Sequence, residues 1–218
     1  MVRLDILSDP ICPWCLIGKT HLDRALAARP DHRFVIAWHP FQLNPDMPKG
    51  GMDRRTYLEA KFGGKERAAQ VYGQIDQAAR DAGIEIDWST IERTPNTLDA
   101  HRLIHWAGVE HRQGPVVDAL FRAFFFDGKD IEDHGTLAAI AGEAGMDADA
   151  TLRLLSTDAD AEDVRARDAN AREKGVTGVP TFIVGDRHAV PGAQPPELWE
   201  RVIDELAGNA QTHPGGTA

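Results

Sequence analysis

The chain has 218 residues, of which 42% are hydrophobic, and its formal net charge is −10 at pH 7. This composition predicts a compact soluble unit with a sizeable core, and the acidic balance argues against nucleic-acid binding, which needs clustered lysine and arginine. No stretch approaches the roughly 18 apolar residues of a membrane span. Arg3 and Asp5 interrupt the N-terminus before a signal-peptide core could form, so we expect a cytoplasmic protein without membrane or nucleic-acid partners.

The first predicted element is a β-strand over residues 2–7, where apolar residues alternate before Asp9-Pro10 ends the pattern. The tetrad Cys12-Pro-Trp-Cys15 follows and holds the only two cysteines of the chain. Helical spacing of apolar residues then continues to Arg29-Pro30, which predicts Cys12 at the helix N-cap and Pro13 at the first helical position. Unpaired N–H groups and the positive end of the helix dipole favour a thiolate at Cys12.

A dithiol redox centre is the leading hypothesis for the tetrad. Cys15 lies one turn further along and faces the packed side of the helix, so we assign Cys12 as the nucleophile and Cys15 as the resolving thiol. Two alternatives stay open, a structural cysteine pair and a zinc site completed by His101 and His105. Residues 16–100 separate the two pairs, whereas a zinc finger uses about a dozen residues, and we therefore expect no metal.

The middle of the chain is predicted to be helical. Residues 33–38 form a second strand, and the helical pattern then covers residues 57–62, 68–82, 97–107, 116–126, 137–144 and 148–155. Arg54-Arg55 sits among acidic residues and is interpreted as part of a solvated helix face. His101 and His105 flank the apolar stripe of the third helix, where His101 is a candidate proton carrier for the thiols, with ordinary packing as the alternative.

The last third of the chain returns to strands. An acidic helix over residues 160–174 leads into Gly175-Val-Thr-Gly-Val-Pro-Thr-Phe-Ile-Val184, a glycine-punctuated turn followed by an apolar strand. Residues 182–184 and 188–190 predict a hairpin. A final helix begins at Pro195-Pro196 and is expected to end at Gly208, with residues 209–218 as a disordered tail.

The tetrad after the first strand, combined with Val179-Pro180-Thr181 before a late strand, resembles the thioredoxin superfamily. Further stretches resemble DsbA-like proteins of the FrnE branch, whose relatives include 2-hydroxychromene-2-carboxylate isomerases and kappa-class glutathione transferases; these stretches are residues 8–18, 41–45, 96–103, 175–182 and 192–195. The resemblance implies an α/β thioredoxin-like fold over residues 1–50 and 158–208, with a helical subdomain inserted at 51–157. It also implies a cis bond before Pro180, facing the active-site sulfurs.

The resemblance implies a thiol-disulfide oxidoreductase, acting as a disulfide reductase or isomerase. Val179 and Pro180 would contact the substrate, while Trp14, beside the cysteines, and Phe41 are expected on an apolar surface around Cys12. Pro13 and Trp14 would tune the thiolate. No bound cofactor is expected, glutathione or another thiol would donate electrons, and protein or small-molecule disulfides would be the substrates.

Other functions and the assembly stay open at this point. The isomerase and transferase relatives generally carry serine in place of Cys12, which favours dithiol chemistry here. A glutathione-dependent isomerase or transferase and a non-catalytic redox sensor are the alternatives. A homodimer is an open option for the oligomeric state.

Overall fold

The computed structural model describes the chain from Met1 to Thr212, and its side chains as far as Gly208. Its main sheet has the strand order β2-β1-β5-β6, with the bounds β1 Val2–Ser8, β2 Phe34–Pro40, β5 Thr181–Val184 and β6 His188–Pro191. β1 pairs with β2 in parallel, and the other pairs are antiparallel. The mixed α/β architecture that the sequence predicted is confirmed.

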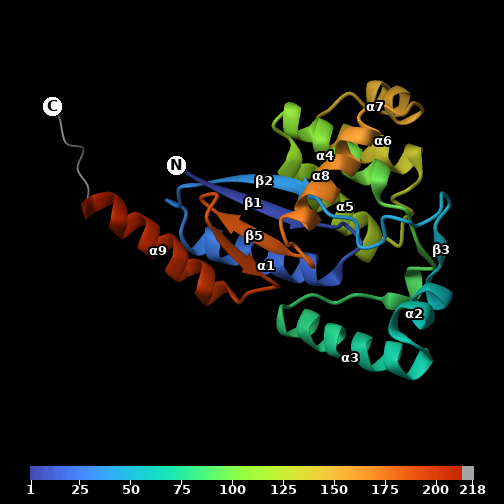
Figure 1. Cartoon of the computed structure of the whole chain (residues 1–218), viewed down its shortest axis with the longest axis horizontal. Helices are drawn as coiled ribbons and strands as arrows, with labels where there is room; N and C mark the ends of the chain where they lie inside the picture. The colour runs from blue at the N-terminus through green and yellow to red at the C-terminus, as the bar shows by residue number, and fades with distance from the viewer. Residues whose placement is uncertain (213–218) are drawn as a thin grey trace.

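Alternation along β1 separates the two faces of the sheet. Leu4 and Ile6 are buried in the core beneath α1 (Pro13–Ala28) and α9 (Pro196–Thr212), which lie on one face (Figure 1). The odd-numbered residues of β1 face the other side, where α8 (Ala161–Glu173) packs against β2. The loop that follows β1 therefore leads directly to the start of α1.

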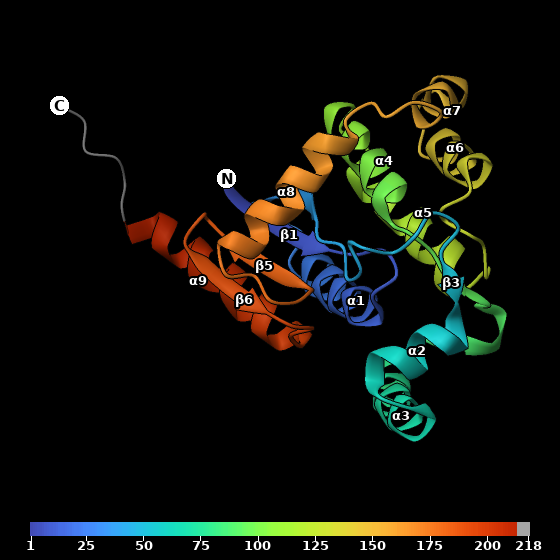
Figure 2. The ribbon, with the colours of Figure 1, turned by 45° about the vertical axis from the view of Figure 1, so that its right-hand side comes forward.

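A helical insertion connects β2 to α8. Its elements are β3 Met52–Asp53, α2 Arg54–Phe62, α3 Lys65–Asp81, a 3-10 turn at Trp88–Thr90, β4 Arg93–Thr94, α4 Leu98–Val109, α5 Gln113–Phe125, α6 His134–Glu143 and α7 Ala148–Leu155. The short strands β3 and β4 pair at the base of an arm that consists of α2 and α3 and projects away from α4, α6 and α7 (Figure 2). Helix α3 of this arm also contacts α1. Phe121, Phe124 and Phe125 of α5 are buried in the core.

The C-terminal helix differs from the sequence-based expectation. α9 continues past Gly208 to Thr212, so the prediction that it ends at Gly208 is wrong, and residues 209–212 of the predicted tail are helical. A glycine inside a helix costs only about 1 kcal/mol relative to alanine, which the flanking helical residues overcome. Residues 213–218 lie outside the described part of the chain. Between Met1 and Thr212, no helix is both long and apolar enough to cross a membrane.

Candidate active site

Cys12 occupies the N-cap of α1, as the sequence predicted. Its backbone is extended, Pro13 is the first helical residue, and the Cys12 carbonyl accepts hydrogen bonds from the backbone N–H groups of Cys15 (3.0 Å) and Leu16 (3.2 Å). The N–H of Cys12 donates to the carbonyl of Asp9 at 2.9 Å, which fixes the entry into the helix. The Cys12 sulfur therefore sits at the positive end of the helix dipole, where negative charge is stabilised.

Cys15 lies one turn inside the helix and is 2% exposed. Burial, and then the neighbouring Cys12 sulfur, raises the pKa of the Cys15 thiol well above its usual value, although the Ser8 side chain and the Asp9 backbone partly counteract this. Cys15 accordingly holds its proton firmly. Both thiols are free in the structure, and both are buried.

The loop before β5 supplies the wall opposite Cys12. The Val179–Pro180 peptide bond is cis, as the family resemblance implied. The Cys12 thiol lies 3.7 Å from the carbonyl oxygen of Val179, so it can donate a weak hydrogen bond to it. This contact joins residues that are 167 positions apart in the sequence.

Gly18 allows the same loop to approach α1 closely. A Cβ atom at this position would lie 3.0 Å from Cγ of Pro180 and 3.3 Å from the backbone of Ala193, which is tighter than ordinary packing. Pro180 is buried in this contact. The absence of a side chain at Gly18 therefore helps to set the position of the loop relative to Cys12.

A buried Asp9–His101 pair lies next to the cysteine loop. Asp9 accepts hydrogen bonds from the backbone N–H groups of Leu43 (2.7 Å) and Ile11 (3.3 Å). Nε2 of His101 stands 3.9 Å from Oδ1 of Asp9, too far for a hydrogen bond, and it has no other partner among the residues that the structure describes. Burial raises the pKa of Asp9 to about 7 and lowers the pKa of His101 to about 3.

These pKa values mean that the pair is not an ion pair at neutral pH. Burial keeps the imidazole uncharged, and it keeps the carboxyl group of Asp9 protonated to a higher pH than an exposed aspartate. Sequence reasoning found His101 but missed Asp9. The sequence feature that could have pointed to Asp9 is its position, directly after a buried strand and three residues before Cys12.

The surface around the cysteines is smaller than the sequence predicted. Trp14 is 38% exposed and adjoins Cys12, which is itself only 3% exposed. Phe41 is fully buried against Leu7 and Ala171, with the guanidinium of Arg172 4.0 Å from its ring centre, so the prediction of an exposed Phe41 is wrong. The Phe41 N–H donates to the carbonyl of Ser8, which turns this loop inward.

The predicted histidine pair does not form a zinc site with the cysteines. His101 faces Asp9, whereas Nε2 of His105 lies 4.0 Å from Asp163. Within residues 1–212, no group of three histidine, cysteine, aspartate or glutamate side chains could hold a metal ion.

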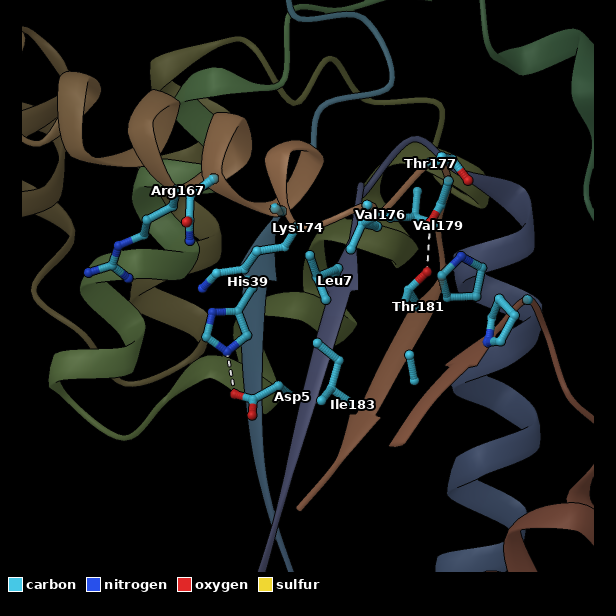
Figure 3. Close-up of a pocket in the computed structure, with 18 of the residues that line it drawn as sticks. Asp5, Leu7, His39, Arg167, Lys174, Val176, Thr177, Val179, Thr181 and Ile183 are labelled. Carbon is cyan, nitrogen blue, oxygen red and sulfur yellow. Dashed lines mark hydrogen bonds and ion pairs between the residues drawn. The ribbon is translucent and has the colours of Figure 1, made fainter. Parts of the chain in front are cut away.

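A cavity of about 1070 Å³ lies on the α8 face of the sheet, behind the loop that carries Val179 (Figure 3). Figure 3 shows His39 pointing at Asp5, and the Nε2–Oδ1 distance is 2.5 Å. Leu7 and Ile183 contribute apolar side chains to its wall. Neither cysteine lines this cavity, but Val179 and Pro180 do, so the cavity adjoins the loop that faces Cys12.

Residues 3–204 match the family of DSBA-like thioredoxin domains. The chain belongs to this DsbA-like family. It is 32% identical to a solved probable DsbA oxidoreductase, SCO1869 of Streptomyces coelicolor, with a TM-score of 0.83 over 95% of this chain and 91% of that one. It is also 28% identical to the uncharacterized protein YwbO of Bacillus subtilis (strain 168), over 94% of this chain and 96% of YwbO.

A third similarity concerns the fold alone. The cytosolic disulfide reductase DsbM of Pseudomonas aeruginosa, solved with GSH, has a TM-score of 0.65 and 17% identity over 94% of this chain and 99% of that one. The thioredoxin-like fold that the sequence predicted is confirmed by these matches. Membership of the DsbA-like family makes this protein an enzyme of the oxidoreductase kind.

Proposed function

We propose that this DsbA-like protein is a cytoplasmic thiol-disulfide oxidoreductase that reduces or isomerises disulfides, with Cys12 as the nucleophile and Cys15 as the resolving thiol. The observation that carries the proposal is the position of the Cys12 sulfur, at the N-terminus of α1 and 3.7 Å from the Val179 carbonyl. Val179 and Pro180 would border the bound substrate on one side, and the exposed Trp14 would border it on the other.

The first step is attack by the Cys12 thiolate on one sulfur of a substrate disulfide. The substrate S–S bond breaks, a mixed disulfide forms between Cys12 and one half of the substrate, and the other half leaves as a thiolate that takes up a proton. The helix N-terminus supports this step because it stabilises the thiolate before the attack.

The second step is attack by Cys15 on the Cys12 sulfur. Cys15 gives up its proton, the Cys12–Cys15 disulfide forms, and the second half of the substrate leaves as a thiolate. The substrate thereby gains two electrons, and the dithiol loses two. Burial, and then the neighbouring Cys12 sulfur, raises the pKa of Cys15, so its thiolate is scarce in the reduced enzyme, which limits unproductive reactions of the second sulfur.

Two molecules of glutathione, or one molecule of a dithiol, would restore the reduced enzyme by giving up two electrons. In isomerisation, a thiolate of the substrate would instead displace Cys12 from the mixed disulfide, with no net change in electrons. A cytoplasmic location favours the reducing direction, because thiol pools there keep most dithiols reduced. The solved DsbM structure with GSH makes glutathione the first donor to test.

The test is a single round of disulfide reduction by the Cys15→Ser variant without added glutathione, because excess glutathione would itself displace Cys12 from the mixed disulfide. We expect the variant to accumulate as a mixed disulfide on Cys12, detectable as a mass increase after acid quenching, while the wild type releases both halves of the substrate. The Thr20→Ser variant, a small change further along α1 that leaves both sulfurs in place, is the matched control. Release of both substrate halves by Cys15→Ser would contradict the dithiol mechanism.

A further inference from the structure

Arg54 is a buried cation without an acidic partner. It is the first residue of α2 and is 9% exposed, although the sequence placed it on a solvated helix face. Among the residues that the structure describes, no carboxylate lies within 4 Å of its guanidinium, and its one side-chain hydrogen bond goes from Nη2 to the hydroxyl oxygen of Tyr72 at 3.0 Å. Removing a charged group from water is costly unless another charge or strong acceptor compensates it.

Two aromatic rings hold the guanidinium in place. Its central carbon lies 5.1 Å from the ring centre of Tyr72 and 5.5 Å from that of Trp88, and these two rings meet edge to face at 5.0 Å. The Trp88 N–H donates to Asp76, which fixes that ring. Cation–π contacts offset part of the lost hydration, but they leave the remaining N–H groups of Arg54 free to donate.

These free donors adjoin a cavity of about 630 Å³ in the α2–α3 arm. Leu58, Ala68 and Ile91 provide apolar parts of its wall. Three carboxylates (Asp53, Glu59 and Glu92) and two further cations (Arg55 and Lys65) also line it, and Glu59 pairs with Arg55. Among these described residues, Arg54 is the buried cation without a carboxylate partner, so the cavity suits a ligand that brings a negative charge to it.

The cavity lies in the arm whose helix α3 packs against α1, the helix that begins directly after Cys12. An extended tripeptide spans about 10 Å, so a peptide ligand held at Arg54 would extend from the arm towards α1. Because the Tyr72 hydroxyl accepts its hydrogen bond from Arg54, its own proton remains available to a ligand.

We propose that Arg54 and Tyr72 form a binding site for a carboxylate of the thiol or disulfide that reacts at Cys12. Arg54 would bind both carboxylate oxygens through its planar guanidinium, and Tyr72 would donate a third hydrogen bond. This inference rests on the proposed function, which it deepens by naming the substrate class as small peptide thiols and disulfides with a free carboxylate. Arg54 and Tyr72 are positioning residues here, since they act on the ligand away from the reacting sulfurs.

The kinetic test compares glutathione disulfide, which carries carboxylates, with bis(2-hydroxyethyl) disulfide, which carries none. We expect Arg54→Gln to lower kcat/KM for glutathione disulfide by about tenfold or more, and to change the value for the neutral disulfide less than about twofold. Arg54→Lys should lie between the wild type and Arg54→Gln, because lysine keeps the charge without the bidentate geometry. Arg67→Gln, an exposed cation of α3, is the charge-matched control and should resemble the wild type.

The binding test needs no redox chemistry. S-methylglutathione cannot exchange disulfides, and calorimetry on the reduced full-length protein would measure its affinity and that of its dimethyl ester. We expect the ester to bind the wild type at least about tenfold more weakly, with the difference lost in Arg54→Gln. Because the ester probes the unaltered protein, this result does not depend on how well Arg54→Gln folds.

The outcomes separate the site from the proposed function. Equal losses on the charged and neutral disulfides, or equal affinities for S-methylglutathione and its ester in the wild type, would overturn the carboxylate site while leaving the dithiol mechanism intact. Arg54-dependent binding of S-methylglutathione by a protein that reduces no disulfide would support the site and contradict the oxidoreductase function.

Discussion

Two regions of this molecule bury polar groups in different ways. Between α4 and the segment that follows α7, Arg102 is 2% exposed and donates to Asp99 and to the carbonyl oxygens of Leu154, Thr157 and Ala159, at 2.7–2.9 Å. The second region, called the cysteine end here, comprises Asp9, Cys12, Cys15 and His101. Burial shifts the pKa of Asp9, His101 and Cys15, and His101 Nε2 has no partner in the described structure.

The difference separates groups that hold the fold from groups available for chemistry. A buried charge such as Arg102, each of whose three nitrogen atoms donates to a protein oxygen, fixes neighbouring segments and has little left to offer a ligand. A buried group with an incomplete set of partners stores an unfavourable interaction that a substrate, a proton or a partner can relieve. Variants of the two regions should therefore affect different properties.

The largest expected effect is on activity at the cysteine end. Cys12→Ser should lower disulfide reduction by about 1000-fold or more, because a serine hydroxyl does not form the mixed disulfide. Its free energy of unfolding should change by only about 1 kcal/mol, since a hydroxyl can also donate to the Val179 carbonyl. A reductase assay and urea denaturation measure the two quantities. Substantial reductase activity in this variant would move the chemistry away from the tetrad.

In the helical insertion, we expect a substitution to lower the free energy of unfolding and to leave the activity unchanged. Arg102→Met should lower the free energy of unfolding by about 3 to 5 kcal/mol, because it leaves the Asp99 carboxylate and three carbonyl groups without their donor. Activity per folded molecule should be unchanged. Urea denaturation measures the loss, with the exposed Arg153→Met of α7 as the control. A loss below about 1 kcal/mol would remove the contrast between the two regions.

The smallest expected effect is a pH dependence that comes from Asp9. Its pKa is about 7 in the folded protein and near 3.8 when unfolded, so the stability that Asp9 contributes is complete below pH 3.8 and is lost as the pH rises through 7. The wild type should lose on the order of 2 kcal/mol relative to Asp9→Asn between pH 5 and pH 7.

His101 acts in the opposite direction, and the comparison of the two proteins removes most of its contribution. Its pKa falls from 6.5 to about 3 on folding, so its stabilisation is complete above pH 6.5 and is lost as the pH falls towards 3. Because both proteins retain His101, the difference between their urea midpoints at each pH reports Asp9. A difference that does not vary with pH would mean that Asp9 is already ionised in the folded state.

The sequence predicted the sulfur site well because its parts are local. The strand, the Asp9-Pro10 break and the helix start at Pro13 are neighbours in the chain, and family resemblance supplied the distant Val179–Pro180 bond. Burial was harder to foresee. Phe41 lies directly after β2 and Arg54 opens α2, where the local sequence does not signal burial. Phe41 is buried by distant residues such as Ala171 and Arg172, and Arg54 by Tyr72 and Trp88.

The measurement that tests the central claim most directly is equilibration of the pure protein in graded glutathione buffers, followed by acid quenching, alkylation and intact-mass analysis. The account predicts reversible loss of two alkylation sites as the internal Cys12–Cys15 disulfide forms, with no glutathione adduct accumulating in the wild type. The midpoint of the transition then gives the direction of the reaction in the cell. A stable glutathione adduct on Cys12, or two cysteines that remain fully alkylated in every buffer, would contradict the dithiol mechanism.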